Sequence, residues 1–325
     1  MLRTRATVLF DVDHPVALGG MGSATSPALV AAVANAGGLA IQGGSGRTPA
    51  QIHDLARDIR ALTSRPFGIN LLLFQASDEL IGATLEARPP VLSTAWARPD
   101  QDLAALFARA HAQGAKVLHM VSRLDEARLA ADAGADCIVA QGTEGGGHVG
   151  LMGSSVFVRQ VARAVNPTPV LAAGGVADGA GLVAALALGA EGVLLGTRFL
   201  ATSEAPLPDR FKEVIIASDG HDTLLTEIPD IASGTVWPGA YARVTRNRLV
   251  QDWLGREGEL RRRRVAVQTG IQQARAAGDP EGAILYAGQV AGLIDAVEPA
   301  AAVVRTIVAE AEAIITARLP GLIGA

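Results

Sequence analysis

A single histidine lies among glycines at the end of an apolar run. The run Cys137–Ala140 leads into the ten residues Gln141–Gly150, five of which are glycine. Backbone without side chains can approach a flat or charged ligand closely, and an imidazole can transfer a proton near neutral pH. The segment therefore predicts a site in which the backbone of the glycines, Gly146 and Gly147 among them, lies against a flat or charged ligand, with His148 held between them. The alternative is a flexible surface loop with an exposed histidine.

Two later glycine loops have the composition of a phosphate site. Gly174-Gly175-Val176 and Gly196-Thr197-Arg198 each follow a short apolar run. Their backbone N–H groups, the threonine hydroxyl and the N-terminal ends of the following helices would all attract a phosphate. The alternative is that the glycines only permit tight turns. Since loops seven and eight of β/α barrels commonly bind phosphate, we predict that the phosphate contacts Gly174, Gly175, Gly196 and Thr197.

The ends of the first and third apolar runs could line a planar ring. The small residues of Gly20-Met21-Gly22 would let a ring approach the backbone, so Met21 and Gly22 are predicted contacts. The amides of Asn70 and Gln141 can each donate to or accept from polar atoms of such a ring or its side chain. The alternative for Asn70 is an ordinary turn residue at a strand end.

These loops can form one site only if the fold brings them close together. The pattern of apolar residues predicts such a fold. Apolar runs alternate with helical patterns eight times within about 200 residues, and the helix-to-strand joints at Gly114, Gly134 and Gly189 each begin with glycine. This repeat predicts an α/β fold, a (β/α)8 TIM barrel, with a doubly wound sheet as the alternative. The predicted strands are 15–18, 39–41, 66–71, 90–94, 116–121, 137–140, 169–173 and 192–195.

The regular repeat ends after Phe199. A more polar region punctuated by prolines follows, and the amphipathic segment 299–319 then resembles a missing eighth barrel helix. We therefore predict a barrel domain of residues 1–205 plus 295–325, and a smaller, mainly helical inserted lid domain of residues 206–294. The arginines of Arg261–Arg264 predict a solvated helix face, or alternatively an anchor for a phosphorylated substrate or nicotinamide nucleotide.

Composition excludes several classes of protein. With 325 residues, 49% hydrophobic residues and a net charge of −4, the chain can bury a large core and has no general attraction to nucleic acid or anionic membrane. Neither a signal peptide nor a membrane span is expected, and the single Cys137 suits a reducing cytoplasm. The chain has no HExxH motif or paired CxxC motif, so no metal is predicted. Helix capping explains Ser154 and Ser155 better than a nucleophile role.

Together these segments resemble the flavin-dependent nitronate monooxygenases, formerly called 2-nitropropane dioxygenases, and the related flavin-dependent enoyl-ACP reductases and NADH:quinone reductases. The resemblance spans nearly the whole chain. Its carriers are Gly20-Met21-Gly22, Asn35-Ala36-Gly37-Gly38-Leu39, Phe67-Gly68-Ile69-Asn70, the segment Gln141 to His148, Ala173-Gly174-Gly175-Val176, Leu195-Gly196-Thr197-Arg198-Phe199 and Ala287-Gly288-Gln289. In the predicted insertion, Val236-Trp237-Pro238-Gly239 and Arg243-Val244-Thr245-Arg246-Asn247 resemble the nitronate monooxygenases more than the enoyl reductases.

The resemblance implies FMN as the cofactor. Its phosphate would lie on Gly175, Gly196 and Thr197, its ring near Met21, Gly22 and Asn70, and Gln141 near the ribityl chain or ring edge, with His148 as the active-site histidine. The chain departs from the family at Gly145, where relatives often carry alanine or serine. It also has His119-Met120 where some relatives carry a lysine, so the positive charge expected near a reduced flavin would come from His119, a helix end or elsewhere.

The function expected from this resemblance is FMN-dependent oxidation of alkyl nitronates by O2 in the cytoplasm, on a small-molecule substrate and without nucleic acid, membrane or metal. One alternative is an NAD(P)H-dependent reductase of a quinone or an enoyl thioester. Another is a flavin-binding regulatory protein without turnover. A homodimer is compatible with each of these.

Overall fold

The chain folds around a closed barrel of parallel strands. The computed structural model describes residues 2–322. Neighbouring barrel strands pair in chain order, and Val193 on the last strand pairs back with Val16 on the first. The barrel strands are β1 Val16–Leu18, β2 Leu39–Gly43, β3 Phe67–Leu72, β4 Val91–Ala95, β5 Lys116–Val121, β6 Cys137–Gln141, β8 Val170–Ala173 and β9 Val193–Leu195. The predicted (β/α)8 barrel is confirmed, and the alternative of an open doubly wound sheet is wrong.

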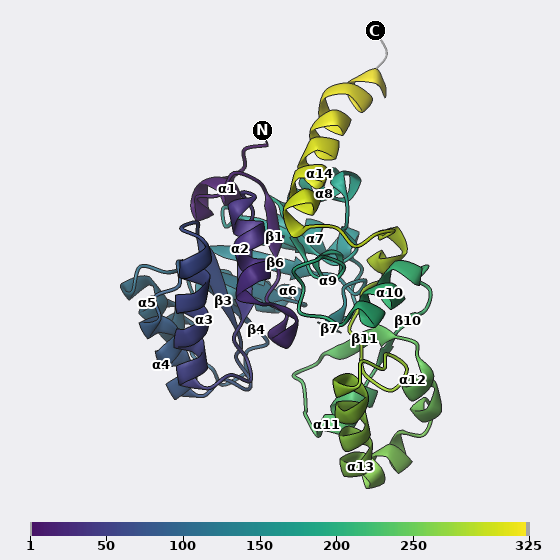
Figure 1. The fold of residues 1–325 in the computed structure, drawn as a ribbon. Helices are drawn as coiled ribbons and strands as arrows, with labels where there is room; N and C mark the ends of the chain where they lie inside the picture. The colour runs from purple at the N-terminus through teal and green to yellow at the C-terminus, as the bar shows by residue number, and fades with distance from the viewer. Residues whose placement is uncertain (1, 323–325) are drawn as a thin grey trace.

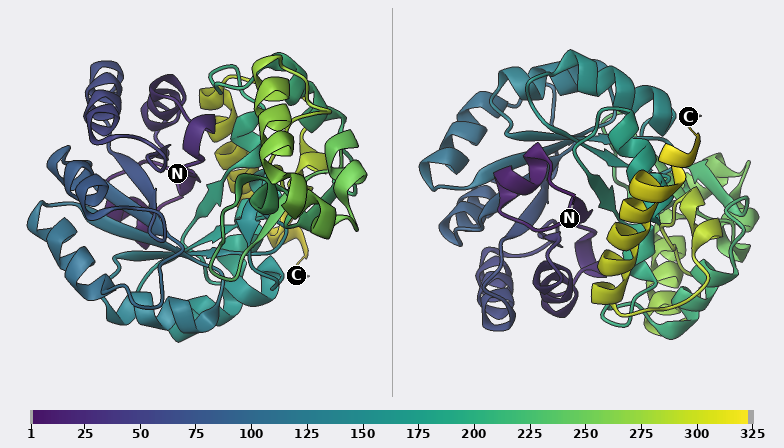
Figure 2. Two further views of the ribbon diagram at one scale, coloured as in Figure 1. Left: turned by 90° about the horizontal axis from the view of Figure 1, so that it is seen from below. Right: turned by 90° about the horizontal axis from the view of Figure 1, so that it is seen from above.

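A ring of helices surrounds these strands (Figure 2). Its members in chain order are α2 Pro27–Asn35, α3 Pro49–Leu62, α4 Asp78–Glu86, α5 Leu103–Ala112, α6 Leu124–Asp132, α7 Ser154–Ala164, α8 Gly179–Ala187 and α14 Ala300–Ala313. The helix α14 packs between α8 and α2, which is the position of the eighth barrel helix predicted from the amphipathic segment. The chain then continues through η3 Ile314–Arg318 and η4 Pro320–Leu322.

Local sequence signals start and end these helices. The side chains of Ser26, Thr48 and Ser77 each accept a hydrogen bond from the backbone N–H three residues ahead, which satisfies a donor at the helix N-terminus. Gly114 and Gly134 end α5 and α6 with φ of 80° and 96°, a backbone conformation that glycine adopts without strain. Each helix therefore leads through a short joint into the next parallel strand, and the C-terminal ends of all barrel strands meet at one rim.

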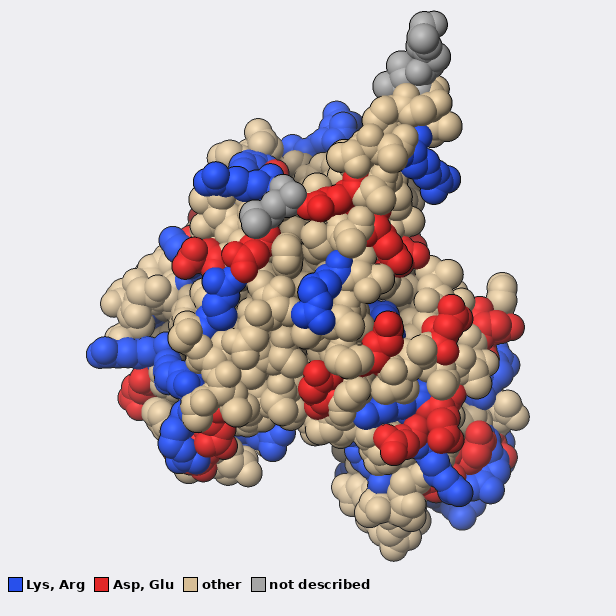
Figure 3. Space-filling view, turned by 45° about the horizontal axis from the view of Figure 1, so that its top comes forward, with Lys and Arg blue, Asp and Glu red and all other residues tan. Residues whose placement is uncertain are grey.

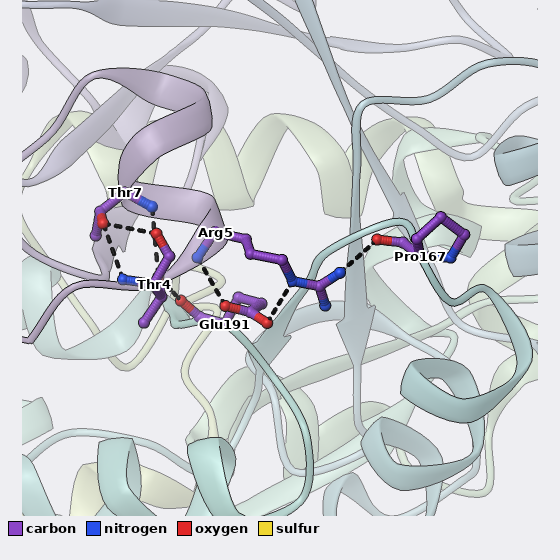
Figure 4. Close-up of polar contacts among 5 residues, drawn as sticks. All are labelled: Thr4, Arg5, Thr7, Pro167 and Glu191. Carbon is purple, nitrogen blue, oxygen red and sulfur yellow. Dashed lines mark hydrogen bonds and ion pairs between the residues drawn. The ribbon is translucent and has the colours of Figure 1, made fainter.

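A short N-terminal helix, α1 Arg5–Phe10, closes the opposite end of the barrel. Its Ala6 and Phe10 side chains belong to the apolar cluster inside the barrel. The Arg5 Nε lies 2.8 Å from Oε1 of Glu191, and the Arg5 backbone N–H donates to the other oxygen of the same carboxylate (Figure 4). No helix is predicted here from the sequence, because six residues give little periodic signal.

Residues between β9 and α14 build a second lobe beside the barrel (Figure 1). It has an apolar cluster of its own, which includes Ile228, Val244, Trp253 and Ile271. Its elements are α9 Thr197–Leu200, α10 Asp209–Ala217, β10 Thr223–Thr226, α11 Ile228–Ser233, β11 Tyr241–Thr245, α12 Arg248–Trp253, α13 Glu257–Ala276 and η2 Gln289–Leu293. The domain boundaries at residues 206 and 294 remain a prediction.

The segment after β6 differs from the predicted loop. Residues Gly147–Val149 form a short strand, β7, which pairs antiparallel with β11 of the insertion. His148 lies opposite Ala242 in this register. The strand order of the resulting sheet is β10-β11-β7, so the sheet joins the rim of the barrel to the insertion.

The surface charges and the helices agree with the expectation that the chain has no general attraction to nucleic acid and no membrane span. Acidic and basic side chains are interspersed over the face shown in Figure 3. Within residues 2–322, no helix combines the length and the apolar character needed to cross a bilayer.

Candidate active site

A cavity of about 350 Å³ lies at the C-terminal ends of the barrel strands. Every residue predicted for the site lines it, so the structure brings the whole set together. These residues are Met21, Gly22, Asn70, Gln141, Gly146, Gly147, His148, Gly174, Gly175, Gly196 and Thr197. Their individual roles remain predictions. A larger but open hollow beside Arg3 and Glu191 lies at the opposite end of the barrel, away from these loops.

The two glycine loops present unpaired backbone donors to the cavity. Within residues 2–322, the N–H groups of Gly175, Gly196 and Thr197 donate no hydrogen bond. Gly174 and Gly175 have φ of 89° and 78°, so both need glycine to avoid strain. The Thr197 hydroxyl accepts from the N–H of Gly288 at 3.0 Å and keeps its own proton to donate. This set of donors fits a phosphate.

The N-terminal end of α7 is satisfied by a side chain from the glycine segment. Glu144 accepts hydrogen bonds from the Ser154 backbone N–H at 2.9 and 3.0 Å and from its hydroxyl at 2.8 Å. The cap is therefore supplied by Glu144, and the prediction that the Ser154 side chain caps the helix is wrong. The N-cap residue is Gly153, which has no side chain with which to cap the helix.

Two amide side chains offer polar groups to a ring or chain in the cavity. The Oδ1 atom of Asn70 accepts from Ser93 Oγ at 3.0 Å, which leaves the Nδ2 hydrogens available. A Cβ atom on Gly20 would lie 2.4 Å from the Asn70 Cβ, so glycine at that position makes room for the amide. The Oε1 atom of Gln141 is buried and has no hydrogen-bond partner within residues 2–322. A buried acceptor without a partner is a place for a ligand donor.

These features together fit a flavin that carries a phosphate. The cavity joins bare N–H groups on two loops, apolar walls that include Val139 and Leu194, and the two amides. In the part of the chain that the structure describes, its lining holds no Asp, Glu, Lys or Arg side chain. A phosphate would therefore be held by backbone groups and helix ends rather than by cations.

His148 is held from two sides by residues of the insertion. Its Nε2 lies 2.8 Å from Oδ1 of Asp230, and only 9% of the His148 side chain and 12% of the Asp230 side chain are exposed. The indole of Trp237 stacks on the imidazole, with ring centroids 3.4 Å apart and 10° between the planes. The ring of Tyr286 lies 5.6 Å from the imidazole. Within residues 2–322, the second ring nitrogen, Nδ1, makes no hydrogen bond.

Trp237 also contacts the barrel loops that follow β3 and β4. Its ring lies 4.7 Å from Phe74, which follows β3, and 5.9 Å edge-on from Trp96, which follows β4. Trp96 has a φ of 55°, which is a strained backbone conformation for a bulky residue. The aromatic contacts therefore connect the insertion to two barrel loops over the cavity.

A buried arginine fixes the start of the glycine segment. Arg243 of β11 donates from Nε to the Thr143 carbonyl at 2.8 Å and from Nη1 to Thr223 at 3.3 Å. Burial lowers the pKa of Arg243, and the nearby Glu144 carboxylate opposes that shift. An arginine stays charged despite such a shift, so Arg243 supplies a fixed positive charge behind the segment.

His119 does not supply a positive charge to the cavity. It lies outside the cavity lining, with its ring 5.6 Å from Phe107 of α5 and its Nδ1 2.7 Å from Thr94 Oγ1. Burial lowers its pKa to about 4, so His119 is neutral at physiological pH. Although 37% of Tyr286 is exposed, desolvation of its hydroxyl and, secondarily, the charge of Asp230 raise its pKa, so the hydroxyl stays protonated. Within residues 2–322, the cavity lining contains His148 but not His119.

Sequence reasoning missed the residues that hold His148. Asp230, Tyr286 and Trp96 carried no recognised signal, since each lies far from the glycine segment in the chain. Trp237 had a signal in the resemblance of residues 236–239 to nitronate monooxygenases, but that resemblance did not indicate a contact with His148.

Comparisons with known proteins give a consistent family and two kinds of reaction. A family model described as nitronate monooxygenase matches residues 3–310. A curated relative from Rhodococcus jostii is 40% identical to this chain over 230 residues, which cover 70% of this chain and 64% of that protein. It is named (3aS,4S,5R,7aS)-5-hydroxy-7a-methyl-1-oxo-octahydro-1H-indene-4-carboxyl-CoA dehydrogenase. The Mycobacterium tuberculosis protein of the same name is 34% identical, with 95% of this chain and 96% of that protein covered.

Two solved structures share the whole fold. FabK from Thermotoga maritima superposes with a TM-score of 0.89 at 35% identity, covering 99% of this chain and 100% of that one. The nitroalkane oxidase from Streptomyces ansochromogenes superposes with a TM-score of 0.82 at 29% identity, covering 96% and 99%. The eight-stranded barrel and the insertion therefore occur together in these relatives.

Proposed function

The chain belongs to the nitronate monooxygenase family of oxidoreductases, and on this premise we propose that it binds FMN and oxidises alkyl nitronates with O2. The observation that carries the proposal is that His148 and the unpaired N–H groups of Gly175, Gly196 and Thr197 line one cavity. The similarity to the Streptomyces nitroalkane oxidase supports a substrate that carries a nitro group. A cytoplasmic location and a homodimer remain predictions.

Each group of residues in the cavity has a separate proposed role. The two glycine loops would hold the phosphate, and Asn70 and Gln141 would bind polar atoms of the ring or ribityl chain. Bound FMN would supply the redox chemistry, taking electrons from the substrate and passing them to O2. His148 would hydrogen-bond the nitro group and orient it, while the aromatic rings of Trp237 and Trp96 cover the cavity and exclude water.

Oxygen uptake tests this proposal directly. The FMN-loaded protein should consume O2 when propionate 3-nitronate is added, and His148→Ala should lose most of that turnover while retaining its flavin. His221→Ala, the same change at an exposed histidine of the insertion, is the matched control and should behave as the parent protein. Turnover that is unchanged in His148→Ala would disprove the assigned role, and a parent protein without any turnover would disprove the proposed reaction.

The second candidate is an NAD(P)H-dependent reductase of a quinone or an enoyl thioester. One observation favours it, namely the 34% identity over almost the full length with a protein whose name includes a carboxyl-CoA dehydrogenase activity. Anaerobic mixing with NADH or NADPH separates the two candidates, because a reductase would lose its flavin absorbance rapidly. A yellow protein that neither nitronate nor nicotinamide reduces would instead support a flavin-binding protein without turnover.

A further inference from the structure

Two arginines of α13 have no partner within the protein. Within residues 2–322, the exposed side chains of Arg264 and Arg275 make no hydrogen bond, ion pair or ring contact. In contrast, Arg263 of the same helix pairs with Glu259 and lies over the ring of Trp253. Residues 260–276 of α13 contain no acidic side chain that could pair with the two arginines. Two cations on one helix are therefore available to a ligand.

Arg264 and Arg275 lie on the same face of α13. They are about three helical turns apart, and Gln268 lies between them, one turn after Arg264. At a rise of about 1.5 Å per residue, these three residues, the arginine row, span roughly 16 Å along the helix. The buried side chains of Leu260 and Ile271 pack beside the arginine row against α11 (Figure 1). This packing fixes the direction in which the arginine row faces.

The arginine row lies beside two aromatic residues that line the cavity. A Cβ atom on Gly234 would lie 2.6 Å from Nη1 of Arg264, so this guanidinium lies directly over the C-terminal end of α11. From Gly234 the chain continues to Trp237, which lines the cavity. Desolvation raises the pKa of the Tyr286 hydroxyl, whereas the charge of Arg275 lowers it, so Arg275 lies near that hydroxyl. Tyr286 borders both the cavity and the solvent, because it lines the cavity and is 37% exposed.

The arginine row can bind a kind of group that the cavity cannot. In the described part of the chain, the cavity lining holds no Lys or Arg side chain, so it offers no cation of this kind to further phosphates. Guanidinium groups bind phosphate through paired N–H donors and keep their charge at physiological pH. Because Arg264 and Arg275 are about three turns apart, they suit phosphates at two separate points of one ligand. A pyrophosphate and a ribose phosphate on one nucleotide have this arrangement.

We propose that the arginine row binds an adenosine diphosphate group with a further phosphate on its ribose, while the rest of that ligand enters the cavity beside Tyr286. One arginine would bind the pyrophosphate and the other the ribose phosphate. Phosphorylated nicotinamide dinucleotides and coenzyme A thioesters share this group, so the ligand is either a reductant or a thioester substrate. The proposal rests on the flavin site of the proposed function, but it does not require a nitronate substrate.

Titration calorimetry tests the arginine row without turnover. The FMN-loaded protein should bind NADP+ or coenzyme A, and the same compound without its ribose phosphate, NAD+ or 3′-dephospho-coenzyme A, should bind about 10-fold more weakly. Arg264→Gln and Arg275→Gln should each weaken binding by about 10-fold, the usual effect of losing one hydrogen-bonded charge contact. Arg262→Gln, the same change at an exposed arginine on another face of α13, is the matched control and should keep the parent affinity. Parent affinity in both Arg264→Gln and Arg275→Gln would overturn the proposal.

The two compounds also distinguish the two sources of the nucleotide. Tighter binding of NADP+ than of coenzyme A would assign the arginine row to a reductant, and the reverse order would assign it to a thioester substrate. Binding of neither compound would overturn the proposal, even if the protein consumes O2 with a nitronate. A protein that binds one of them at the arginine row but consumes no O2 with a nitronate would support this inference and contradict the proposed function.

Discussion

The indole of Trp237 lies almost parallel to the imidazole of His148, with 3.4 Å between the ring centroids. The same indole contacts Phe74 and Trp96 on two barrel loops. One side chain from the insertion therefore both contacts the candidate catalytic histidine and lines the cavity beside it. Removal of this indole should therefore affect both the orientation of His148 and the access of water to the cavity.

Trp237→Ala should lower kcat/KM for nitronate about 10- to 100-fold, since a displaced catalytic group commonly costs about 10²-fold. Trp237→Phe keeps an aromatic face and should lose less. Quenching of flavin fluorescence by acrylamide should rise in the alanine variant, because the cavity is open. Val236→Ala, at the neighbouring residue that is 85% exposed, is the control. Normal kinetics and normal quenching in Trp237→Ala would contradict both functions of this residue.

Gly175→Ala should weaken FMN binding by about 10-fold or more, because alanine at a φ of 78° strains the loop and moves the N–H group away from the phosphate. Gly114→Ala is a matched control with nearly the same backbone angle, 80°, at the other end of the barrel. Both variants should lose about 1–2 kcal/mol of stability. Flavin titration of the apoprotein measures the difference, and equal FMN affinity in the two variants would argue against a phosphate at Gly175.

Buried His119 should make the stability of the fold sensitive to acid. Its pKa is about 4 in the folded protein, against an ordinary value of 6.5 in the unfolded chain, so the unfolded chain binds more protons between these values. Stability therefore falls as the pH drops from 6.5 toward 4, by about 3 kcal/mol from this residue. His119→Asn cannot take up that proton, and its urea midpoint should fall less steeply over the same range. Parallel pH profiles for the two proteins would show that His119 does not contribute.

Phe10→Ala should destabilise the protein by about 3–5 kcal/mol, because it leaves a cavity where α1 closes the barrel. Val8→Ala on the same helix is the control, since Val8 is 59% exposed and its truncation should cost little. Urea unfolding with flavin bound and removed measures both. A loss below about 1 kcal/mol for Phe10→Ala would mean that the end of the barrel repacks without this ring.

The barrel was predictable because its signals are local. Alternating apolar runs and glycines such as Gly114 and Gly134 define each repeat, and parallel strands then bring Asn70 and Gly175 to one rim. The partners of His148 were not predictable in this way. Asp230 reaches it through the pairing of β7 with β11, and a three-residue strand that begins with glycine has neither the length nor the composition of a recognisable strand.

The pairing of β7 with β11 also affects protein engineering. In the part of the chain that the structure describes, the strand that carries His148 belongs to the sheet of the insertion rather than to the barrel. A chimera that exchanges only residues 206–294 between relatives would separate His148 from its native partner strand β11, which pairs with β7. Transplants that include residues 142–150 with the insertion keep this unit intact, so the smallest portable module consists of two separate pieces of sequence.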